Sequence, residues 1–280
     1  MKRIYFIIFM LAVNVAMAEN LRIITYNIRL NIASDGVNAW PNRKDQVCAL
    51  LDFHQAEIFG LQEALYNQIQ DISAKMPKMK WVGVGRDDGK QAGEFSPIFY
   101  DGEKFKALKN GGFWLSPTPD KPGLGWDAAC NRVCTWITLK EEKSGDKFMV
   151  FCTHFDHVGV KAREESAKLI LKKIKELNTD KLPVILMGDF NSTPDMEAFT
   201  TISTELKDSR AISKKPPYGP TGTFNSFKFD APMKDRIDYV FVNDKVEVKR
   251  YAVLTDNKDQ RFPSDHQPVL VVLDLKYGKK

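Results

Sequence analysis

The chain has 280 residues, of which 43% are hydrophobic and 28% are charged, and its formal net charge at pH 7 is +5. This modest positive charge excludes a protein covered by the strong basic field typical of nucleic-acid-binding domains. The length allows a sizeable buried core, and no Pro/Gly/Ser-rich linker, repeat or low-complexity tract divides the chain.

The first eighteen residues have the pattern of a cleaved export signal. Lys2 and Arg3 precede an apolar stretch, which ends on the small-x-small pattern of residues 16–18. The apolar stretch is short for a membrane-spanning helix, so no stable membrane span is expected. We therefore predict a signal peptide at residues 1–18, a single domain at residues 19–280, and an exported protein that is periplasmic, secreted or at the cell surface.

Strands and helices alternate in the first part of the predicted mature chain. Residues 21–30 read as a strand, residues 43–54 carry apolar side chains at helical spacing, and residues 57–63 form a short apolar run typical of a buried strand. A second helix is predicted at residues 66–76. A further strand is predicted at residues 81–86.

The middle of the chain is rich in strands. Residues 96–100 and 103–116 are strand-like and flank an Asp-Gly turn, and residues 134–155 predict a hairpin that turns at residues 143–146. A helix is predicted at residues 161–177, where the apolar side chains form one stripe and the lysines face water.

The last third returns to strands, with one short helix after Pro194. The strands are predicted at residues 183–191, 236–242, 246–254 and 268–275. Two antiparallel-rich sheets with helices on their outer faces would explain this order of elements.

The four cysteines do not predict a definite disulfide or zinc site. Cys48 and Cys152 lie within apolar patterns and read as small buried hydrophobic residues. If the chain between Cys130 and Cys134 is extended, their Cα atoms are about 13 Å apart, too far for a disulfide. Only a turn would let them pair, so the sequence leaves this open. Zinc is disfavoured because no second CxxC or CxxH set is present.

Polar residues stand where predicted strands begin or end. Four of them follow an apolar run, and two precede one. If all share one rim of the molecule, the last two strands run opposite to the first four. The residues that follow a run are Asn27, Glu63, His154 and Asp189, and those that precede one are Asp238 and His266.

The motifs around these residues resemble the endonuclease/exonuclease/phosphatase superfamily, which includes deoxyribonuclease I, abasic-site endonucleases, neutral sphingomyelinases and inositol polyphosphate 5-phosphatases. The resemblance extends from Asn27 to His266 and preserves the family's motif order. It implies an α/β fold, namely a four-layered α/β/β/α sandwich of two mainly antiparallel sheets flanked by helices. The motifs are TYN at 25–27, LQE at 61–63, CTH at 152–154, GDFN at 188–191, RID at 236–238 and SDH at 264–266.

The resemblance implies a site for Mg²⁺, or Mn²⁺, that Glu63 holds as the principal ligand. Carboxylate oxygen suits these cations, which keep several waters and accept substrate phosphate oxygens. Asn27 is similar to the family's asparagine beside the metal, although a turn-capping role is an alternative. Asp265 would complete the metal shell, provided that the chain bends before Pro268 so that neighbouring side chains share one side.

The same resemblance assigns catalytic roles to five residues. Asp189 would align or deprotonate the attacking water while Asn191 donates to a phosphoryl oxygen. His266, held by the carboxylate of Asp238, would act as an acid/base or stabilise the developing charge. His154 would donate a hydrogen bond to a non-bridging phosphate oxygen.

Three weaker candidates would contact the substrate. Arg132 could clamp a phosphate with two hydrogen bonds, although an ordinary surface arginine would look the same. His157 and Asn225 are possible substrate contacts. The loops at residues 93–100 and 222–227 resemble family loops that flank the pocket.

The predicted function is an exported, divalent-metal-dependent phosphoesterase or phosphodiesterase that uses in-line attack by water. The expected partner is a small-molecule, glycan-linked or lipid-linked phosphate ester, and the chain is expected to be a monomer. A secreted nuclease acting on DNA or RNA is one alternative. A sphingomyelinase-like lipid phosphodiesterase is another, because residues 113–126 resemble an aromatic membrane-contacting hairpin. A non-catalytic binding module ranks last because no expected site residue is missing.

Overall fold

The computed structural model describes residues 20–276. The predicted signal peptide at residues 1–18 lies outside the described residues. Among residues 20–276, no helix has the length and apolar character needed to cross a membrane.

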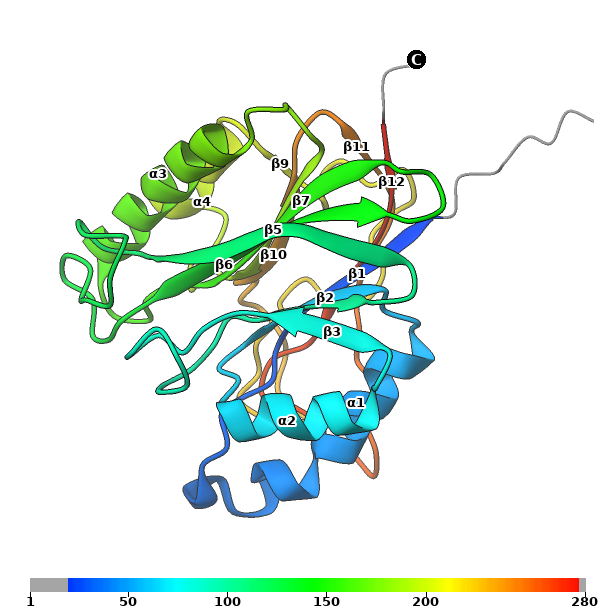
Figure 1. Ribbon diagram of the computed structural model, residues 1–280. Coiled ribbons are helices and arrows are strands. Elements are labelled where there is room, and N and C mark those ends of the chain that lie inside the picture. The colour runs from blue at the N-terminus through cyan, green and yellow to red at the C-terminus, as the bar shows by residue number, and fades with distance from the viewer. Residues whose placement is uncertain (1–19, 277–280) are drawn as a thin grey trace, which may run out of the picture.

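Two six-stranded sheets pack face to face (Figure 1). The strands of the first sheet, in spatial order, are β11 (Val246–Val253), β12 (Val269–Leu275), β1 (Leu21–Asn27), β2 (Ile58–Gln62), β4 (Ile98–Asp101) and β3 (Met79–Val82). Those of the second are β5 (Phe105–Trp114), β6 (Val133–Glu141), β7 (Lys147–His154), β8 (Val184–Asp189), β10 (Asp238–Val242) and β9 (Lys207–Asp208).

Helices cover the outer face of each sheet and complete four layers. The helices α1 (Lys44–Phe53) and α2 (Tyr66–Lys75) pack on the first sheet, whereas α3 (Val160–Leu177) and α4 (Glu197–Ser203) pack on the second (Figure 1). A third apolar cluster fills the space between the sheets. The predicted α/β/β/α sandwich is therefore confirmed, and each sheet is mixed because β1–β2 and β7–β8 are parallel pairs.

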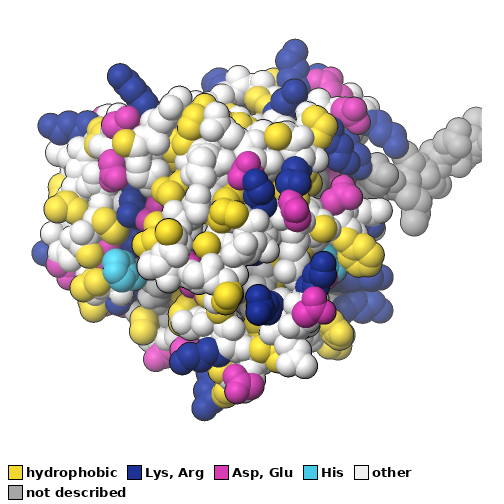
Figure 2. Space-filling model, turned by 90° about the horizontal axis from the view of Figure 1, so that it is seen from below, with side chains coloured by type: hydrophobic (Ala, Val, Ile, Leu, Met, Phe, Trp, Pro, Cys, Tyr) yellow, Lys and Arg dark blue, Asp and Glu magenta, His cyan; other side chains and the backbone are white. Residues whose placement is uncertain are grey.

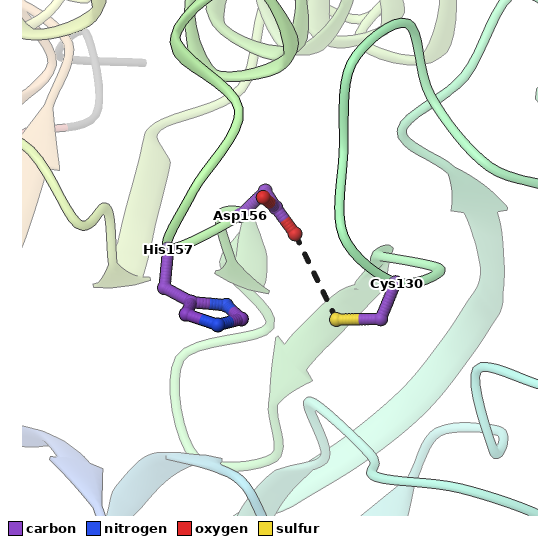
Figure 3. Close-up of side chains that lie close together, drawn as sticks. All are labelled: Cys130, Asp156 and His157. Carbon is purple, nitrogen blue, oxygen red and sulfur yellow. Dashed lines mark hydrogen bonds between the residues drawn. The ribbon is translucent and has the colours of Figure 1, made fainter.

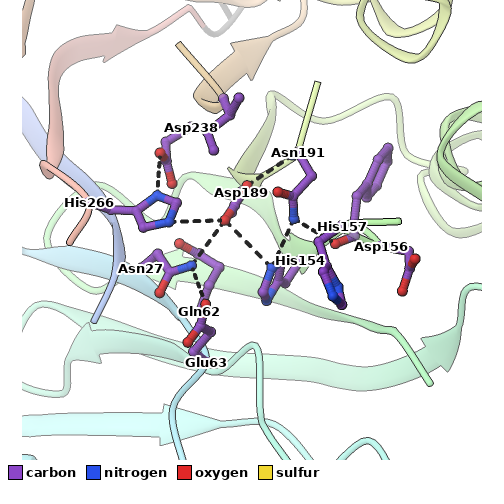
Figure 4. Close-up of polar contacts among 12 residues, drawn as sticks. Asn27, Gln62, Glu63, His154, Asp156, His157, Asp189, Asn191, Asp238 and His266 are labelled. Atoms are coloured by element: carbon purple, nitrogen blue, oxygen red, sulfur yellow. Dashed lines mark hydrogen bonds and ion pairs between the residues drawn. The ribbon is translucent and has the colours of Figure 1, made fainter. Parts of the chain in front are cut away.

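The strand directions agree with the expected shared rim. In the first sheet β12 runs antiparallel to β1, and in the second β10 runs antiparallel to β8. The residues just before β12 therefore lie beside the end of β1, and the first residue of β10 lies beside the end of β8. Figure 4 shows these residues gathered in one place.

Four local features differ from the expectation or were missed. The strand expected at residues 81–86 is β3 (Met79–Val82), which begins and ends earlier. The Asp-Gly turn joins β4 to β5, and these strands belong to different sheets, so it does not close a hairpin. Residues 33–42 contain two short 3₁₀ helices, η1 (Ala33–Asn38) and η2 (Trp40–Asn42), which the sequence did not indicate. The two-residue strand β9 was also missed.

Candidate active site

A cavity of about 520 Å³ opens at the rim where the strands of both sheets end. Most of the residues that the sequence singled out line it, and Figure 4 shows how several of them point toward one another. The lining contains Glu63, Arg132, His154, His157, Asp189, Asn191, Asp265 and His266. Asn27 and Asp238 lie directly behind, in contact with these residues.

Glu63 follows β2 in the left-handed backbone region, with a φ of 59°. One carboxylate oxygen accepts a hydrogen bond from Asn27 Nδ2 at 3.1 Å, and the other accepts one from the backbone of Leu30 at 3.1 Å. Backbone strain of this kind costs about 1–3 kcal/mol and persists where the surroundings hold the residue in place. The Glu63 carboxylate is therefore fixed toward the cavity.

The donor set at Glu63 fits a hard divalent cation. Burial raises the pKa of Asp265, and the nearby charge of Glu63 raises it further. A cation between these two carboxylates would relieve that repulsion, and oxygen ligands are those that Mg²⁺ and Mn²⁺ prefer. Glu63 and Asp265 could therefore hold the metal, and the neighbouring Asp189, Asp238 and His266 offer ligand atoms within 4.8 Å of one another.

Asn27 points its amide nitrogen, rather than its oxygen, at the carboxylates. Its Nδ2 donates to Glu63 at 3.1 Å and to Asp189 at 3.0 Å, while its Oδ1 accepts the backbone N–H of Arg29 at 3.0 Å. Only this orientation satisfies all three contacts, because carboxylates accept and N–H groups donate. In this geometry Asn27 orients Glu63 and Asp189 and does not offer its oxygen to a metal.

Asp189 ends β8 and is almost completely buried. It accepts from Asn27 Nδ2 and from the backbone N–H of Asn191 at 2.9 Å. Its Oδ2 lies 3.5 Å from His154 Nε2 and 3.8 Å from His266 Nε2. Burial, followed by the charge of Asp238, raises the pKa of Asp189, which makes this carboxylate a better proton acceptor.

His266 and Asp238 form the expected pair. His266 Nδ1 lies 2.9 Å from Asp238 Oδ2, which also accepts the hydroxyl of Thr223 at 2.6 Å. Burial alone would lower the pKa of His266, but the charges of Asp238 and Asp189 outweigh it and raise the pKa to about 10. His266 is therefore an imidazolium whose Nε2–H faces Asp189 and the cavity.

His154 has the opposite protonation state. Burial and the charge of Arg132 lower the pKa of His154 to about 3, so the ring is neutral. Its Nε2 lies 3.2 Å from Asn191 Nδ2. Asn191 Nδ2 donates one N–H to the carbonyl of Phe155 at 3.0 Å, which holds its amide beside the imidazole.

The three weaker candidates have different surroundings. Arg132 is buried, and its guanidinium contacts Asp156 at 3.4 Å and His157 Nδ1 at 3.0 Å. His157 is exposed and lines the cavity. Asn225 is buried outside the cavity lining, with its Nδ2 donating to the carbonyl of Lys228, and its neighbours Phe224, Ser226 and Phe227 line the cavity instead.

Sequence reasoning missed several lining residues that come from loops. Arg86 and Glu94 form an ion pair of 2.8 Å, and Arg29 pairs with Asp35 at 3.0 Å. The loop at 93–100 was expected beside the pocket, but Arg86 and Glu94 themselves were not singled out. Loop residues have no periodicity that would indicate which side chains meet. Only Arg29 could have been predicted from the sequence, because it lies two residues after Asn27 of the TYN motif.

The comparison with protein families agrees with this geometry. The Endonuclease/Exonuclease/phosphatase family matches residues 24–266. The chain belongs to this family. Its two sheets and flanking helices have the fold of the family's phosphoesterases, and family members generally use a divalent metal.

Two solved structures of family members from Bacteroides thetaiotaomicron are similar to the chain. One, described as an endonuclease/exonuclease/phosphatase family protein, has 40% identity and a TM-score of 0.88, covering 91% of this chain and 98% of that one. The other, a mannosyl-6-phosphatase, has 40% identity and a TM-score of 0.88, covering 91% and 100%. An uncharacterized protein of Acanthamoeba polyphaga mimivirus is 29% identical over 183 residues, which span 61% of this chain and 66% of the viral protein.

Proposed function

We propose that the protein is an exported, Mg²⁺-dependent or Mn²⁺-dependent hydrolase that cleaves a phosphate ester by in-line attack of water. The observation that carries this proposal is the convergence of Glu63, Asp189 and His266 on one cavity. Asn27 touches both Glu63 and Asp189, and His266 Nε2 lies 3.8 Å from Asp189. The export part rests on the sequence of residues 1–18 alone.

Each metal-binding or catalytic candidate in the cavity has a separate role in the proposed hydrolysis. A cation held by Glu63 and Asp265 would supply Lewis acidity at a phosphoryl oxygen. Asp189 aligns the attacking water and accepts its proton. The Nε2–H of His266 and the amide of Asn191 donate to phosphoryl oxygens, where negative charge grows in the transition state.

His154 and Asp238 complete this arrangement. With its ring proton on Nε2, neutral His154 can donate one hydrogen bond beside Asp189 without adding a second positive charge, and it then accepts none from Asn191. Asp238 keeps His266 protonated and fixes its ring. Asn27 holds Glu63 and Asp189 at a constant separation, so metal and water meet the phosphate in one geometry.

The substrate we favour is a small-molecule or glycan-linked phosphate rather than nucleic acid. The mannosyl-6-phosphatase with 40% identity supports this choice. On the face that carries α1 and α2, lysine and arginine side chains alternate with acidic and apolar ones and form no continuous basic stripe (Figure 2). The formal net charge of +5 also gives no strong basic field of the kind that a phosphate backbone attracts.

The lipid alternative has less structural support. Phe113 and Trp114, at the start of the suspected hairpin, are buried, and the Trp114 indole donates to the carbonyl of Arg86 at 2.7 Å. These aromatic side chains are therefore part of the protein interior. Leu124 is exposed, but one leucine buries little area in a bilayer.

A panel of phosphate esters tests the proposal. The purified protein is assayed with 4-nitrophenyl phosphate, bis(4-nitrophenyl) phosphate, mannose 6-phosphate, plasmid DNA and sphingomyelin, in Mg²⁺ or in EDTA. We expect Mg²⁺-dependent release of phosphate from the monoesters. Glu63→Gln should lower that rate at least about 100-fold, because one charge and one ligand of the metal are lost.

Glu142→Gln is the matched control, because Glu142 is an exposed glutamate in the β6–β7 turn. It should leave the rate unchanged. Cleavage of DNA alone would replace the proposed substrate with nucleic acid. Full activity of Glu63→Gln in EDTA would overturn the metal-dependent mechanism.

A further inference from the structure

One part of the cavity wall has no role in the proposed hydrolysis. It consists of Glu94, from the loop before β4, and His157, from the loop after β7. Arg86 contacts Glu94, and Arg132 contacts His157. We call Glu94 and His157 the polar wall. The wall adjoins the catalytic residues, because Glu94 Oε2 lies 3.7 Å from His154 Nδ1.

Each residue of the polar wall is held by an arginine. Arg86 Nη1 contacts Glu94 Oε2 at 2.8 Å, and Arg132 Nη2 contacts His157 Nδ1 at 3.0 Å. A guanidinium can only donate, so His157 Nδ1 must accept and the ring proton lies on Nε2. The wall therefore offers a fixed N–H donor on His157 and a fixed carboxylate acceptor on Glu94.

Arg132 itself is locked in place by Asp156. Asp156 accepts backbone N–H groups from Ala129, Val158 and Gly159, and it contacts Arg132 Nε at 3.4 Å. Figure 3 shows Asp156 beside Cys130 and His157, a grouping whose ligand atoms lie within 4.8 Å of one another. The Arg132 cation already contacts both Asp156 and His157, so this grouping supports the wall rather than a metal ion.

The charges of this region are balanced. Arg86 pairs with Glu94, and Arg132 pairs with Asp156. Arg132 Nη1 also lies 4.0 Å from Glu94 Oε2, so the two residues of the polar wall flank one guanidinium. A second phosphate or a carboxylate placed here would meet the Glu94 carboxylate, whereas a hydroxyl group can accept from His157 and donate to Glu94.

The cavity lining also includes two aromatic rings. Phe224 packs on the ring of His266 with centroids 4.9 Å apart, and Phe227 faces the guanidinium of Arg43 at 5.7 Å. Phe227 and the preceding Ser226 both have a positive φ, of 62° and 57°. Non-glycine residues rarely adopt this conformation, and it holds Phe227 at the cavity.

We propose that the polar wall of Glu94 and His157 is a specificity subsite that binds hydroxyl groups of a sugar whose phosphate lies at Glu63, Asp189 and His266. The proposal rests on the proposed function and deepens it. The preferred substrate class is then a monophosphate of a neutral sugar. Arg132 and Arg86 are positioning residues that act through His157 and Glu94.

The test compares substrates that share the phosphate but differ in hydroxyl groups. The kcat/KM values for mannose 6-phosphate and for 4-nitrophenyl phosphate are measured in Mg²⁺ for the wild type, His157→Ala, His157→Gln and Val158→Ala. In His157→Ala the ratio of the two values should fall about tenfold, the usual effect of one lost hydrogen bond to a substrate hydroxyl. His157→Gln, which restores an N–H near the Nε2 position, should recover part of the ratio.

Val158→Ala is the matched control because Val158 is exposed, adjacent to His157 and absent from the cavity lining. It should leave the ratio unchanged, and thermal unfolding checks that every variant is folded. In a second measurement, the wild type should hydrolyse hexose 6-phosphate better than hexose 1,6-bisphosphate, since Glu94 opposes a second anion.

Different results would overturn the sugar subsite and the proposed phosphoesterase function. An unchanged ratio in His157→Ala, or a preference for the bisphosphate, overturns the sugar subsite while aryl phosphate hydrolysis upholds the metal-dependent phosphoesterase. Hydrolysis of the aryl ester but of no sugar phosphate also overturns only the subsite. Failure to hydrolyse any phosphate ester in Mg²⁺ or Mn²⁺ overturns the proposed function itself.

Discussion

Two histidines flank Asp189, and they differ in charge because His266 also faces a carboxylate whereas His154 also faces an arginine. His266 contacts the carboxylate of Asp238 directly, and this charge overcomes the cost of burial. His154 has Arg132 nearby, which adds to the cost of burial and keeps the ring neutral. One imidazolium and one neutral imidazole on the two sides of Asp189 give the cavity one strong cationic donor and avoid a second buried positive charge.

The charge of His266 predicts a pH dependence of stability. The pKa of His266 in the folded protein, about 10, is higher than its ordinary value of 6.5. The ion pair therefore stabilises the fold fully below about pH 6.5, and its contribution disappears as the pH rises through about 10. The difference in unfolding free energy between the wild type and His266→Gln should shrink over this range.

Urea unfolding in EDTA, from pH 6 to pH 10.5, measures this difference without any contribution from a bound metal. A difference that stays constant across the range would mean that His266 is not charged in the folded protein.

Metal binding predicts a second effect at the residue scale. A cation that binds only the folded protein raises its stability by about 2.7 kcal/mol at one hundred times the dissociation constant. Mg²⁺ should therefore raise the midpoint of thermal unfolding relative to EDTA. Asp265→Asn should weaken this shift, and Glu63→Gln should weaken it most. An equal shift in the wild type and in Glu63→Gln would remove Glu63 from the metal site.

At the scale of single elements, β8 explains why the sequence is informative about the site. Its apolar run is buried along its whole length, and Asp189 follows at the point where the strand reaches the cavity. Burying a carboxylate without a partner is costly, so an aspartate after such a run indicates a functional contact. The same pattern predicted the positions of Glu63 and His154, whereas His266 precedes its apolar run.

Gly188, directly before Asp189, lies where β8 packs closely against the backbone of β7. A Cβ atom at Gly188 would lie 2.1 Å from the carbonyl oxygen of Thr153, and the residue has a φ of 155°. Gly188→Ala should destabilise the fold by more than about 3 kcal/mol, because backbone atoms of β7 would have to move. Chemical denaturation measures this change.

Gly145→Ala separates the steric clash from the backbone strain. Gly145 also has a positive φ, of 80°, but nothing lies within 4 Å of its Cβ position. This variant should cost only about 1 kcal/mol. Equal losses in the two variants would show that the contact with Thr153 is unimportant.

Loops and turns mark the limit of sequence reasoning about these elements. The pairing of Arg86 with Glu94 and the burial of Asn225 depend on tertiary neighbours, which local residue patterns do not encode. The Asp-Gly turn after β4 illustrates the same limit, because a turn signal does not reveal whether the next strand joins the same sheet. Strand periodicity predicted the sandwich, whereas the partners of loop side chains needed the structure.

At the scale of the whole molecule, the cavity is divided between the two sheets. The first sheet and the segments that flank it contribute Glu63 and Asp265, the proposed metal ligands, and Asn27, which orients Glu63. The second sheet contributes His154, Asp189 and Asp238. His266 precedes a strand of the first sheet but bonds to Asp238 of the second, so the proposed catalytic geometry depends on how the two sheets are packed.

Gly60 lies where the two sheets approach each other closely. It is in β2, three residues before Glu63, and a Cβ atom there would lie 2.7 Å from Cys152 Sγ of β7 and 2.7 Å from Met187 Cε of β8. Cys152 and Met187 each stand two residues before a catalytic candidate, His154 and Asp189. A methyl group at Gly60 should therefore push the proposed metal side of the cavity away from the proposed acid/base side.

We expect Gly60→Ala to lose about 1–3 kcal/mol of stability and roughly 100-fold in kcat, because a displacement near 1 Å is enough to disturb the reacting geometry. The rate is measured with 4-nitrophenyl phosphate at a temperature where the variant is folded. The double variant Gly60→Ala/Cys152→Ala should recover part of the rate, since removing Sγ makes room for the new methyl group, and Cys152→Ala alone is its control. If folded Gly60→Ala kept the wild-type kcat, the separation of the sheets would not control catalysis.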